Sequence, residues 1–249
     1  MRAFIQSKGG IPRGTSSYAA WTGFNHMGVE TVLYEANDEL AKCEREDVVV
    51  GGLGAAWFRL QALGITPGKI DYPEELTGFL GRKVWRSTIN HVNNERDSWP
   101  LFVKPVDEKR FVGRVVRGIK DLIGAGCSGD DAPVICSEVV EFSSEYRCFV
   151  RYGKILDVRH YRGDWAVAPD RNVVDAAIAT YKSAPAAYAM DLGVTKDGKT
   201  LLVEVNDGYS LGSYGLLPEL YAQFLTSRWS ELVGMQDPLN FGVELPDEY

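Results

Sequence analysis

The stretch at residues 187–208, AYAMDLGVTKDGKTLLVEVNDG, indicates the fold of the chain around it. Two apolar runs flank Asp197-Gly198, a dipeptide that favours a tight hairpin turn. Because side chains alternate along a strand, Glu204 and Asn206 are expected on one face, and Asp191 can face them across the ladder. Oxygen ligands suit hard cations such as Mg²⁺, which usually also contact substrate phosphates. The hairpin therefore predicts a magnesium-nucleotide site.

The main alternative is a surface hairpin whose acidic side chains are merely solvated. Against it, Glu204 stands inside the apolar run Leu-Leu-Val-Glu-Val, which is expected to be buried. A buried carboxylate requires a partner or a metal ion. Strict alternation in this strand places Leu202 on the face of Glu204, and the opposite face is expected to carry Leu201, Val203 and Val205.

The composition is that of an ordinary globular protein. The chain has 249 residues, of which 45% are hydrophobic and 24% charged, and its length allows one large domain or two small ones. No window approaches a membrane span, and residues 1–6 are too short for a signal peptide. The net charge of −7 argues against a general nucleic-acid binder. We therefore expect a cytoplasmic protein that does not associate with membranes.

The cysteines and histidines form no metal-binding pattern in the sequence. The four cysteines lack CxxC spacing and a histidine partner, so they are expected to be reduced and mostly buried: Cys43, Cys127, Cys136 and Cys148. His26 and His91 are expected to be structural. His160 lies between two candidate arginines, and we expect it near the site.

Residues 1–97 alternate between short apolar runs and helical segments. Strands are expected at residues 2–6, 29–34 and 48–50, and helices at 16–27 and 55–63. This order predicts a small α/β domain with a parallel sheet. Gly51-Gly-Leu-Gly54 lacks the GxGxxG spacing of dinucleotide-binding turns, but it can line a substrate pocket at the carboxyl end of a strand.

Residues 98–249 have a different pattern. Strands are expected at 100–105, 134–138, 145–152 and 155–160, before the hairpin at 187–205. Helical segments are expected at 117–123, 172–182 and 218–232. Antiparallel strands with interspersed helices predict an α+β second domain.

Four landmarks occur in a fixed order along this second part: Val103-Lys104-Pro105, Glu138-Val139-Val140, Glu145-Tyr-Arg147, and Asp191 with Glu204 and Asn206. In this combination residues 98–210 resemble the ATP-grasp superfamily of carboxylate–amine ligases, in the branch with one lysine and two arginines at the phosphate positions. The preceding part looks like the small α/β domain that usually precedes an ATP-grasp module. The resemblance implies ATP and Mg²⁺ as cofactors.

The resemblance gives roles to the cationic side chains. Lys104 would contact the α- and β-phosphates, and a lysine within an apolar strand does require an anion; the alternative is a lysine that snorkels from an edge strand. Arg147 and Arg159 lie on neighbouring strands and would contact phosphate or an acyl-phosphate. Arg162 is either a further candidate for that role or an ordinary loop charge. Most family members carry an arginine where this chain has Ala189, and whether another arginine replaces it stays open.

The resemblance also identifies a nucleoside-binding segment. Glu138, Val139 and Val140 would form the hinge that contacts adenine, largely through backbone groups. Glu145 would accept hydrogen bonds from the ribose hydroxyls. The alternative for Glu145 is a strand charge paired with Arg147.

The implied function is an ATP- and Mg²⁺-dependent ligase for small molecules. Asp191, Glu204 and Asn206 would hold the metal at the β- and γ-phosphates, a carboxylate would form an acyl-phosphate, and an amine would displace the phosphate. The family association suggests an amino acid or a peptide-like amine as acceptor. A small-molecule kinase and a non-catalytic nucleotide-binding module are the alternatives, the second favoured by Ala189. The resemblance also suggests that a glycine-rich turn after the metal ligands touches the acceptor through Tyr209, Ser210, Ser213 and Tyr214; the alternative is a plain packed turn.

Overall fold

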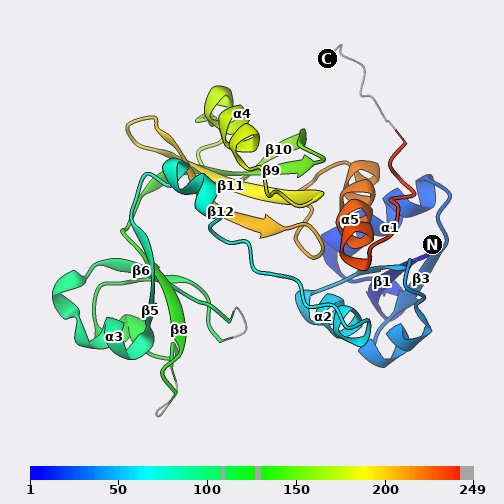
Figure 1. Cartoon of the computed structure of the whole chain (residues 1–249), viewed down its shortest axis with the longest axis horizontal. Helices are drawn as coiled ribbons and strands as arrows, with labels where there is room; N and C mark the ends of the chain where they lie inside the picture. The colour runs from blue at the N-terminus through cyan, green and yellow to red at the C-terminus, as the bar shows by residue number, and fades with distance from the viewer. Residues whose placement is uncertain (108–109, 127–129, 242–249) are drawn as a thin grey trace.

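The computed structural model of the chain describes residues 1–107, 110–126 and 130–241 (Figure 1). These residues form a mixed α+β architecture in which three four-stranded sheets are accompanied by helices. The predicted fold class is confirmed: the first sheet is mainly parallel, and the other two are antiparallel.

The N-terminal sheet has a parallel core. The strand β1 (Ala3–Lys8) pairs in parallel with β3 (Thr31–Tyr34) and β4 (Val48–Val50), and in antiparallel with β2 (Ile11–Pro12). The helices of this unit are α1 (Gly14–His26) and α2 (Leu53–Ala62), with the 3-10 segment η1 (Asn37–Lys42). The buried Asp47 accepts hydrogen bonds from the backbone N–H of Arg2 at 2.7 Å and from its guanidinium at 2.6 Å. This pair ties together the starts of β1 and β4.

The second sheet has the strand order β5-β8-β6-β7. Its strands are β5 (Val84–Thr88), β6 (Leu101–Pro105), β7 (Arg114–Val116) and β8 (Pro133–Ser137). The short elements beside it are α3 (Ile89–Asn94), η3 (Arg96–Ser98) and η4 (Ile119–Leu122), whereas η2 (Glu74–Phe79) precedes β5 in sequence and packs against the third sheet. The helical segment expected at residues 117–123 is thus a 3-10 turn. The division at residues 97/98 stays a prediction, although this sheet has strands on both sides of it.

The third sheet has the order β10-β9-β11-β12 and contains the hairpin predicted at residues 187–205. Its strands are β9 (Phe142–Arg151), β10 (Lys154–Gly163), β11 (Ala187–Thr195) and β12 (Thr200–Asp207), and α4 (Arg171–Thr180) lies between β10 and β11 in sequence. Both predicted hairpins, β9–β10 and β11–β12, are present.

A β-bulge in β12 changes the face of several side chains. Glu204 lies opposite Asp191, but the residue after Asp191 pairs with Leu202, so Val203 is the extra residue. As a result Leu202 and Val205 both pack into the same core, whereas Val203 lines a cleft together with Glu204. The prediction of strict alternation is therefore wrong in this strand, because the bulge shifts its phase by one residue.

The C-terminal helix α5 (Pro218–Val233) packs against α1 of the N-terminal unit (Figure 1). One hydrophobic core joins the buried residues of the first sheet and α5 to Phe149, Ala187 and Ala189 of the third sheet. The N-terminal unit is therefore fixed against the third sheet through shared core packing.

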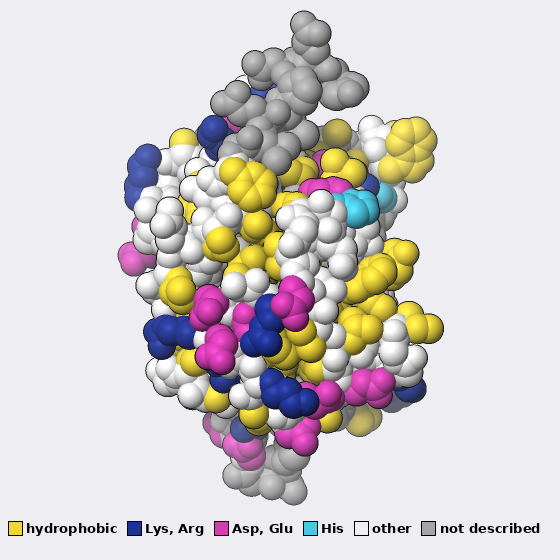
Figure 2. Space-filling view, turned by 90° about the vertical axis from the view of Figure 1, so that its right-hand side faces the viewer, with side chains coloured by type: hydrophobic (Ala, Val, Ile, Leu, Met, Phe, Trp, Pro, Cys, Tyr) yellow, Lys and Arg dark blue, Asp and Glu magenta, His cyan; other side chains and the backbone are white. Residues whose placement is uncertain are grey.

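The described part of the chain contains no helix that is long and apolar enough to cross a bilayer. Cys43, Cys136 and Cys148 are buried and free, and burial raises the pKa of the thiols of Cys43 and Cys136 to about 11. Cys127 lies outside the described residues. On the face in Figure 2, basic and acidic side chains are interspersed with hydrophobic ones, in keeping with the absence of a basic bias in the sequence.

Candidate active site

A cleft with a cavity of about 770 Å³ lies between the second and third sheets. Most of the predicted site residues line it. From the end of β8 these are Glu138, Val139 and Val140, and from the third sheet they are Glu145, Arg147, Asp191 and Glu204. Its volume is in the range of small-molecule sites.

Lys104 lies on β6 and reaches the third sheet across the cleft. Its ammonium donates to Glu204 Oε2 at 2.9 Å and to Asp71 Oδ1 at 2.7 Å. Burial alone would lower the pKa of Lys104, but the carboxylate of Glu204 and the other anionic neighbours outweigh this effect and raise it. The side chain is 13% exposed, so a buried, charged ammonium stands at this position rather than a snorkelling one.

Arg147 and Asp191 form a second cation–carboxylate pair on directly opposed positions of β9 and β11. Arg147 donates from Nε to Oδ1 at 2.8 Å and from Nη2 to Oδ2 at 2.7 Å, the bidentate geometry of a strong charge-assisted pair. Asp191 is 3% exposed, and burial raises the pKa of its carboxyl against the opposing effect of Arg147. Asn206 Nδ2 also donates to Asp191 Oδ2, at 3.2 Å.

The donor atoms of the predicted metal ligands suit a hard cation. Asp191 and Glu204 are opposed across the β11–β12 ladder, and the side-chain amide of Asn206 touches Asp191. Within the described ranges, no three His, Cys, Asp or Glu side chains group as a cation site. Two carboxylates and an amide oxygen nevertheless fit Mg²⁺, which fills its remaining positions with phosphate oxygens and water.

The segment predicted to bind adenine follows β8 into the cleft. Glu138 pairs with Lys83 through its backbone N–H at 3.1 Å and through its carboxylate, which accepts from Lys83 N at 2.8 Å. Phe142 also lines the cleft and packs against Gly193, where an added Cβ would stand 2.2 Å from the ring. The wall therefore combines backbone groups with an aromatic face.

Glu145 does not pair with Arg147, the alternative that the sequence left open. It accepts hydrogen bonds from the Tyr161 hydroxyl and from Arg162 Nη1, both at 2.9 Å. Tyr161 is a cleft residue that the sequence analysis missed. A register shift between His160 and Arg162 brings it there, and no local sequence pattern marks that shift.

Arg159 and His160 lie away from the cleft wall. Arg159 is directly opposite Arg147 in the β9–β10 ladder, but its 40% exposed side chain contacts Asp157 and the carbonyl of Tyr214. His160 packs edge-on against Tyr146, with ring centroids 5.0 Å apart. The phosphate role of Arg159 stays a prediction, and so does the expectation that His160 lies near the site, since His160 is not among the described residues that line the cleft.

The glycine-rich turn after β12 joins the cleft to the N-terminal unit. Trp57 Nε1 donates to the Tyr209 hydroxyl at 2.7 Å, and Ser210 Oγ donates to the carbonyl of Gly51 at 3.0 Å. The ring of Tyr214 lies 4.6 Å from the Arg147 guanidinium, and its backbone has a positive φ of 46°. This turn therefore brings the Gly51 region to the same end of the cleft as Arg147.

Comparisons with known proteins agree with this geometry. The family model described as ATP-grasp domain, R2K clade family 2, matches residues 79–224. The D-alanine–D-alanine ligase from Bacillus anthracis complexed with ATP is 16% identical, with a TM-score of 0.56 over 93% of this chain and 96% of that one. The L-amino acid ligase from Bacillus licheniformis is 11% identical, with a TM-score of 0.57 over 98% and 77%.

A third solved structure has a similar fold. The N5-carboxyaminoimidazole ribonucleotide synthetase from Thermotoga maritima is 11% identical, with a TM-score of 0.55 over 90% of this chain and 75% of that one. At these identities the similarity concerns the fold alone. No curated protein matches the sequence at a significant level.

Proposed function

The chain belongs to the ATP-grasp domain family described as R2K clade family 2, and on this premise we propose that it is an ATP- and Mg²⁺-dependent ligase that joins a carboxylate to an amine. The observation that carries the proposal is that Arg147, Asp191 and Glu204 line one cleft between two antiparallel sheets. Arg147 pairs with Asp191 there, and Lys104 binds Glu204 from the neighbouring sheet. The two cations can exchange their carboxylate partners for phosphate oxygens, and the two carboxylates can exchange their cationic partners for a divalent metal ion.

In the proposed complex the hinge residues Glu138, Val139 and Val140 contact adenine, and Glu145 accepts from the ribose. Glu145 has two donors already, so the ribose hydroxyls would replace Tyr161 or Arg162 as its partners. Glu145 and its donors lie on the third sheet, and the hinge follows β8 of the second sheet. A nucleotide in this cleft would therefore contact both sheets.

At the phosphate end, Lys104 and Arg147 contact the triphosphate, and Arg159, which is opposite Arg147 in the β9–β10 ladder, would have to turn towards it from its present contacts. Asp191, Glu204 and Asn206 would hold Mg²⁺, which supplies charge neutralisation at the β- and γ-phosphates when bound. The protein residues then act by positioning and by fixed charge, as in other phosphoryl transfers.

The reaction has two steps. An oxygen of the carboxylate substrate attacks the γ-phosphorus, the bond to the β–γ bridging oxygen breaks, and ADP leaves. The amine nitrogen then attacks the acyl carbon, phosphate leaves with the acyl C–O bond pair, and the nitrogen loses a proton. Arg147 and Arg159 are the candidates to balance charge on the acyl-phosphate.

Ala189 stands where most family members carry an arginine, and its surroundings have no room for one. It is fully buried in the core that contains Phe149 and α5. The partner of Ala189 on the neighbouring strand β9 is Phe149, and Arg147 stands two positions earlier on β9, opposite Asp191. We therefore propose that Arg147 supplies the charge that position 189 lacks.

The test is a screen of amino acids and small carboxylates for ADP and phosphate release with Mg²⁺-ATP. A ligase gives free phosphate and an amide only when acid and amine are both present. A stable phosphorylated product would instead identify a kinase, and ATP binding without ADP release under every mixture would identify a non-catalytic module. The buried free thiols fit the cytoplasm as the proposed location.

A further inference from the structure

The segment between α2 and η2 contains Asp71, whose carboxylate binds Lys104. Asp71 Oδ1 accepts from the Lys104 ammonium at 2.7 Å, slightly shorter than the 2.9 Å bond from Lys104 to Glu204. Asp71 precedes the residues matched by the family model, which begin at residue 79. Its partner Lys104 also binds the cleft residue Glu204, although Asp71 itself belongs to the connection from the N-terminal unit.

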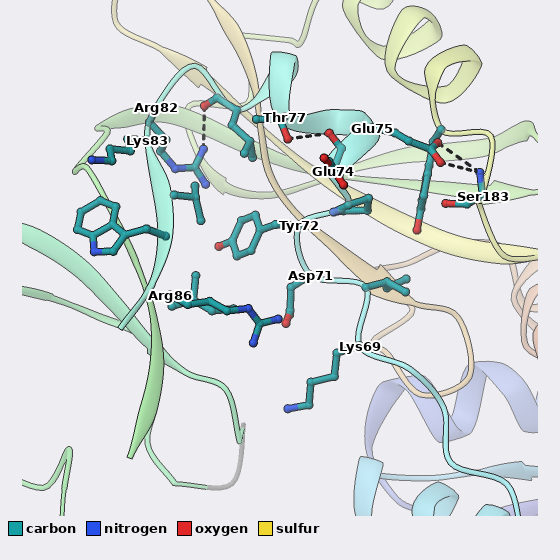
Figure 3. A pocket seen from close by; sticks show the side chains of 17 residues that line it. Lys69, Asp71, Tyr72, Glu74, Glu75, Thr77, Arg82, Lys83, Arg86 and Ser183 are labelled. Carbon is teal, nitrogen blue, oxygen red and sulfur yellow. Dashed lines mark hydrogen bonds between the residues drawn. The ribbon is translucent and has the colours of Figure 1, made fainter. Parts of the chain in front are cut away.

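The backbone fixes Asp71 in place. Its carbonyl accepts from Val205 N at 2.9 Å, which attaches the connection to the edge of β12. The neighbouring ring of Tyr72 lies with its centroid 4.9 Å from Lys104 Nζ. Figure 3 shows Asp71 and Tyr72 side by side on this connection, with Arg86 also directed towards Asp71. Lys104 is thus held by a carboxylate and an aromatic face of one short segment.

Asp71 and Glu204 line different cavities. Glu204 lines the nucleotide cleft, whereas Asp71 lines the neighbouring cavity of about 920 Å³ shown in Figure 3. A metal ion bound by Glu204 would take that carboxylate away from Lys104. Asp71, which faces the other cavity, would remain its partner while the free donor of the ammonium turns to phosphate.

We propose that Asp71 is a positioning residue that holds the Lys104 ammonium towards the phosphates of ATP. The inference rests on the proposed function, in which Lys104 contacts phosphate. A flexible lysine side chain loses rotamer freedom when it binds an anion, and a second carboxylate behind it removes part of that freedom in advance. The lysine–glutamate pair of protein kinases acts in the same way on a phosphate-binding lysine.

The test compares ATP with adenosine in binding titrations on the full chain. Asp71→Asn should weaken Mg²⁺-ATP binding about tenfold, near the low end for a hydrogen bond between charged groups. It should leave adenosine binding unchanged, since adenosine has no phosphate for Lys104 to contact. Asp71→Glu should restore most of the ATP affinity. Glu74→Gln is the matched control and should bind both ligands normally, because Glu74 is an exposed acid at the start of η2, three residues from Asp71, with no ion pair among the described contacts.

A double variant distinguishes positioning from a structural role. If Asp71 acts through Lys104, adding Asp71→Asn to Lys104→Met causes no further loss of ATP affinity. Equal losses for ATP and adenosine in Asp71→Asn, or an additive loss in the double variant, would overturn the inference. Tighter ATP binding by Asp71→Asn would overturn it too, because simple charge repulsion would then dominate. If Lys104→Met itself keeps full ATP affinity, the phosphate role of Lys104 in the proposed function fails instead.

Discussion

Removal of the Arg147 guanidinium should make the stability of the protein depend on Mg²⁺. The variant Arg147→Met leaves Asp191, which is 3% exposed, with only the amide of Asn206 as a hydrogen-bonding partner among the described contacts. Breaking a buried ion pair from one side costs about 3–5 kcal/mol. For a chain of this length, a loss of that size corresponds to a Tm lower by between about 6 and about 20 °C.

Mg²⁺ should recover much of this loss. In the wild-type protein the cation competes with Arg147 for Asp191, whereas in the variant the carboxylate is free to bind it. At a free Mg²⁺ concentration roughly 100 times the Kd, binding stabilises the folded state by about 2.7 kcal/mol. The assay is thermal unfolding without nucleotide, with Mg²⁺ or EDTA, and the Mg²⁺-dependent rise in Tm should be larger in the variant than in the wild type.

A matched control lies on the same strand. Arg151 pairs with the buried Asp237 at 3.0 Å, so Arg151→Met also removes a cation from a buried carboxylate, but far from the proposed metal ligands along β9. It should lose stability without any gain in its response to Mg²⁺. An equal Mg²⁺ response in Arg147→Met and the wild type, or an equally enlarged response in Arg151→Met, would refute the placement of the metal beside Asp191.

Three further outcomes follow from the described contacts. Glu204→Gln should abolish most Mg²⁺-dependent nucleotide binding and turnover, and unchanged values for both in a titration and an ADP-release assay would remove Glu204 from the metal site. Asp47→Asn should lower the free energy of unfolding by about 2 kcal/mol at pH 7, as measured by urea unfolding. Burial acts to raise the pKa of Asp47, but the bonds from Arg2 and the backbone lower it overall. The stability difference between wild type and variant should therefore be complete above the unfolded pKa of about 3.9 and fade as pH falls through the lower folded pKa. Gly193→Ala should displace the Phe142 ring, lower the free energy of unfolding by about 1–3 kcal/mol, and weaken the binding of adenosine as well as ATP in a titration.

Local sequence patterns were sufficient for much of the fold. The Asp197-Gly198 turn and its apolar flanks predicted the β11–β12 hairpin, and Val48–Val50 was recognised as a strand with its observed bounds. The strand β5 was missed because its side chains are mostly half-buried and show no apolar run. The strand β7 was missed because it has only three residues. Pattern reasoning therefore works where burial is strong and continuous, and fails for short or half-exposed strands.

The candidate site was predictable only where a charged residue stands within an apolar strand. A lysine in an apolar strand and a glutamate in another each require a partner, and Lys104 and Glu204 prove to be partners of one another. The contact of Asp71 with Lys104 could not be predicted in this way, because Asp71 lies in a polar connection and reaches Lys104 only through the packing of the two sheets. The bulges that place Val203 and Tyr161 in the cleft could not be predicted either, since a one-residue shift in register does not change the local amino-acid composition.

The pairing of cations with carboxylates in this cleft bears on what it can bind. Under the proposed roles, Mg²⁺ alone must compete with Lys104 and Arg147 for the carboxylates, and ATP alone must compete with those carboxylates for the two cations. Bound together, metal and triphosphate satisfy both sets of groups, because each new charge replaces a partner that the other has taken. The Arg147–Asp191 pair is buried and the Lys104–Glu204 pair is partly buried, so an unpaired charge at either is costly. With these proposed roles, the cleft would favour the magnesium–nucleotide complex over either component, and Asp71 would remain a carboxylate partner of Lys104 when Glu204 binds the metal.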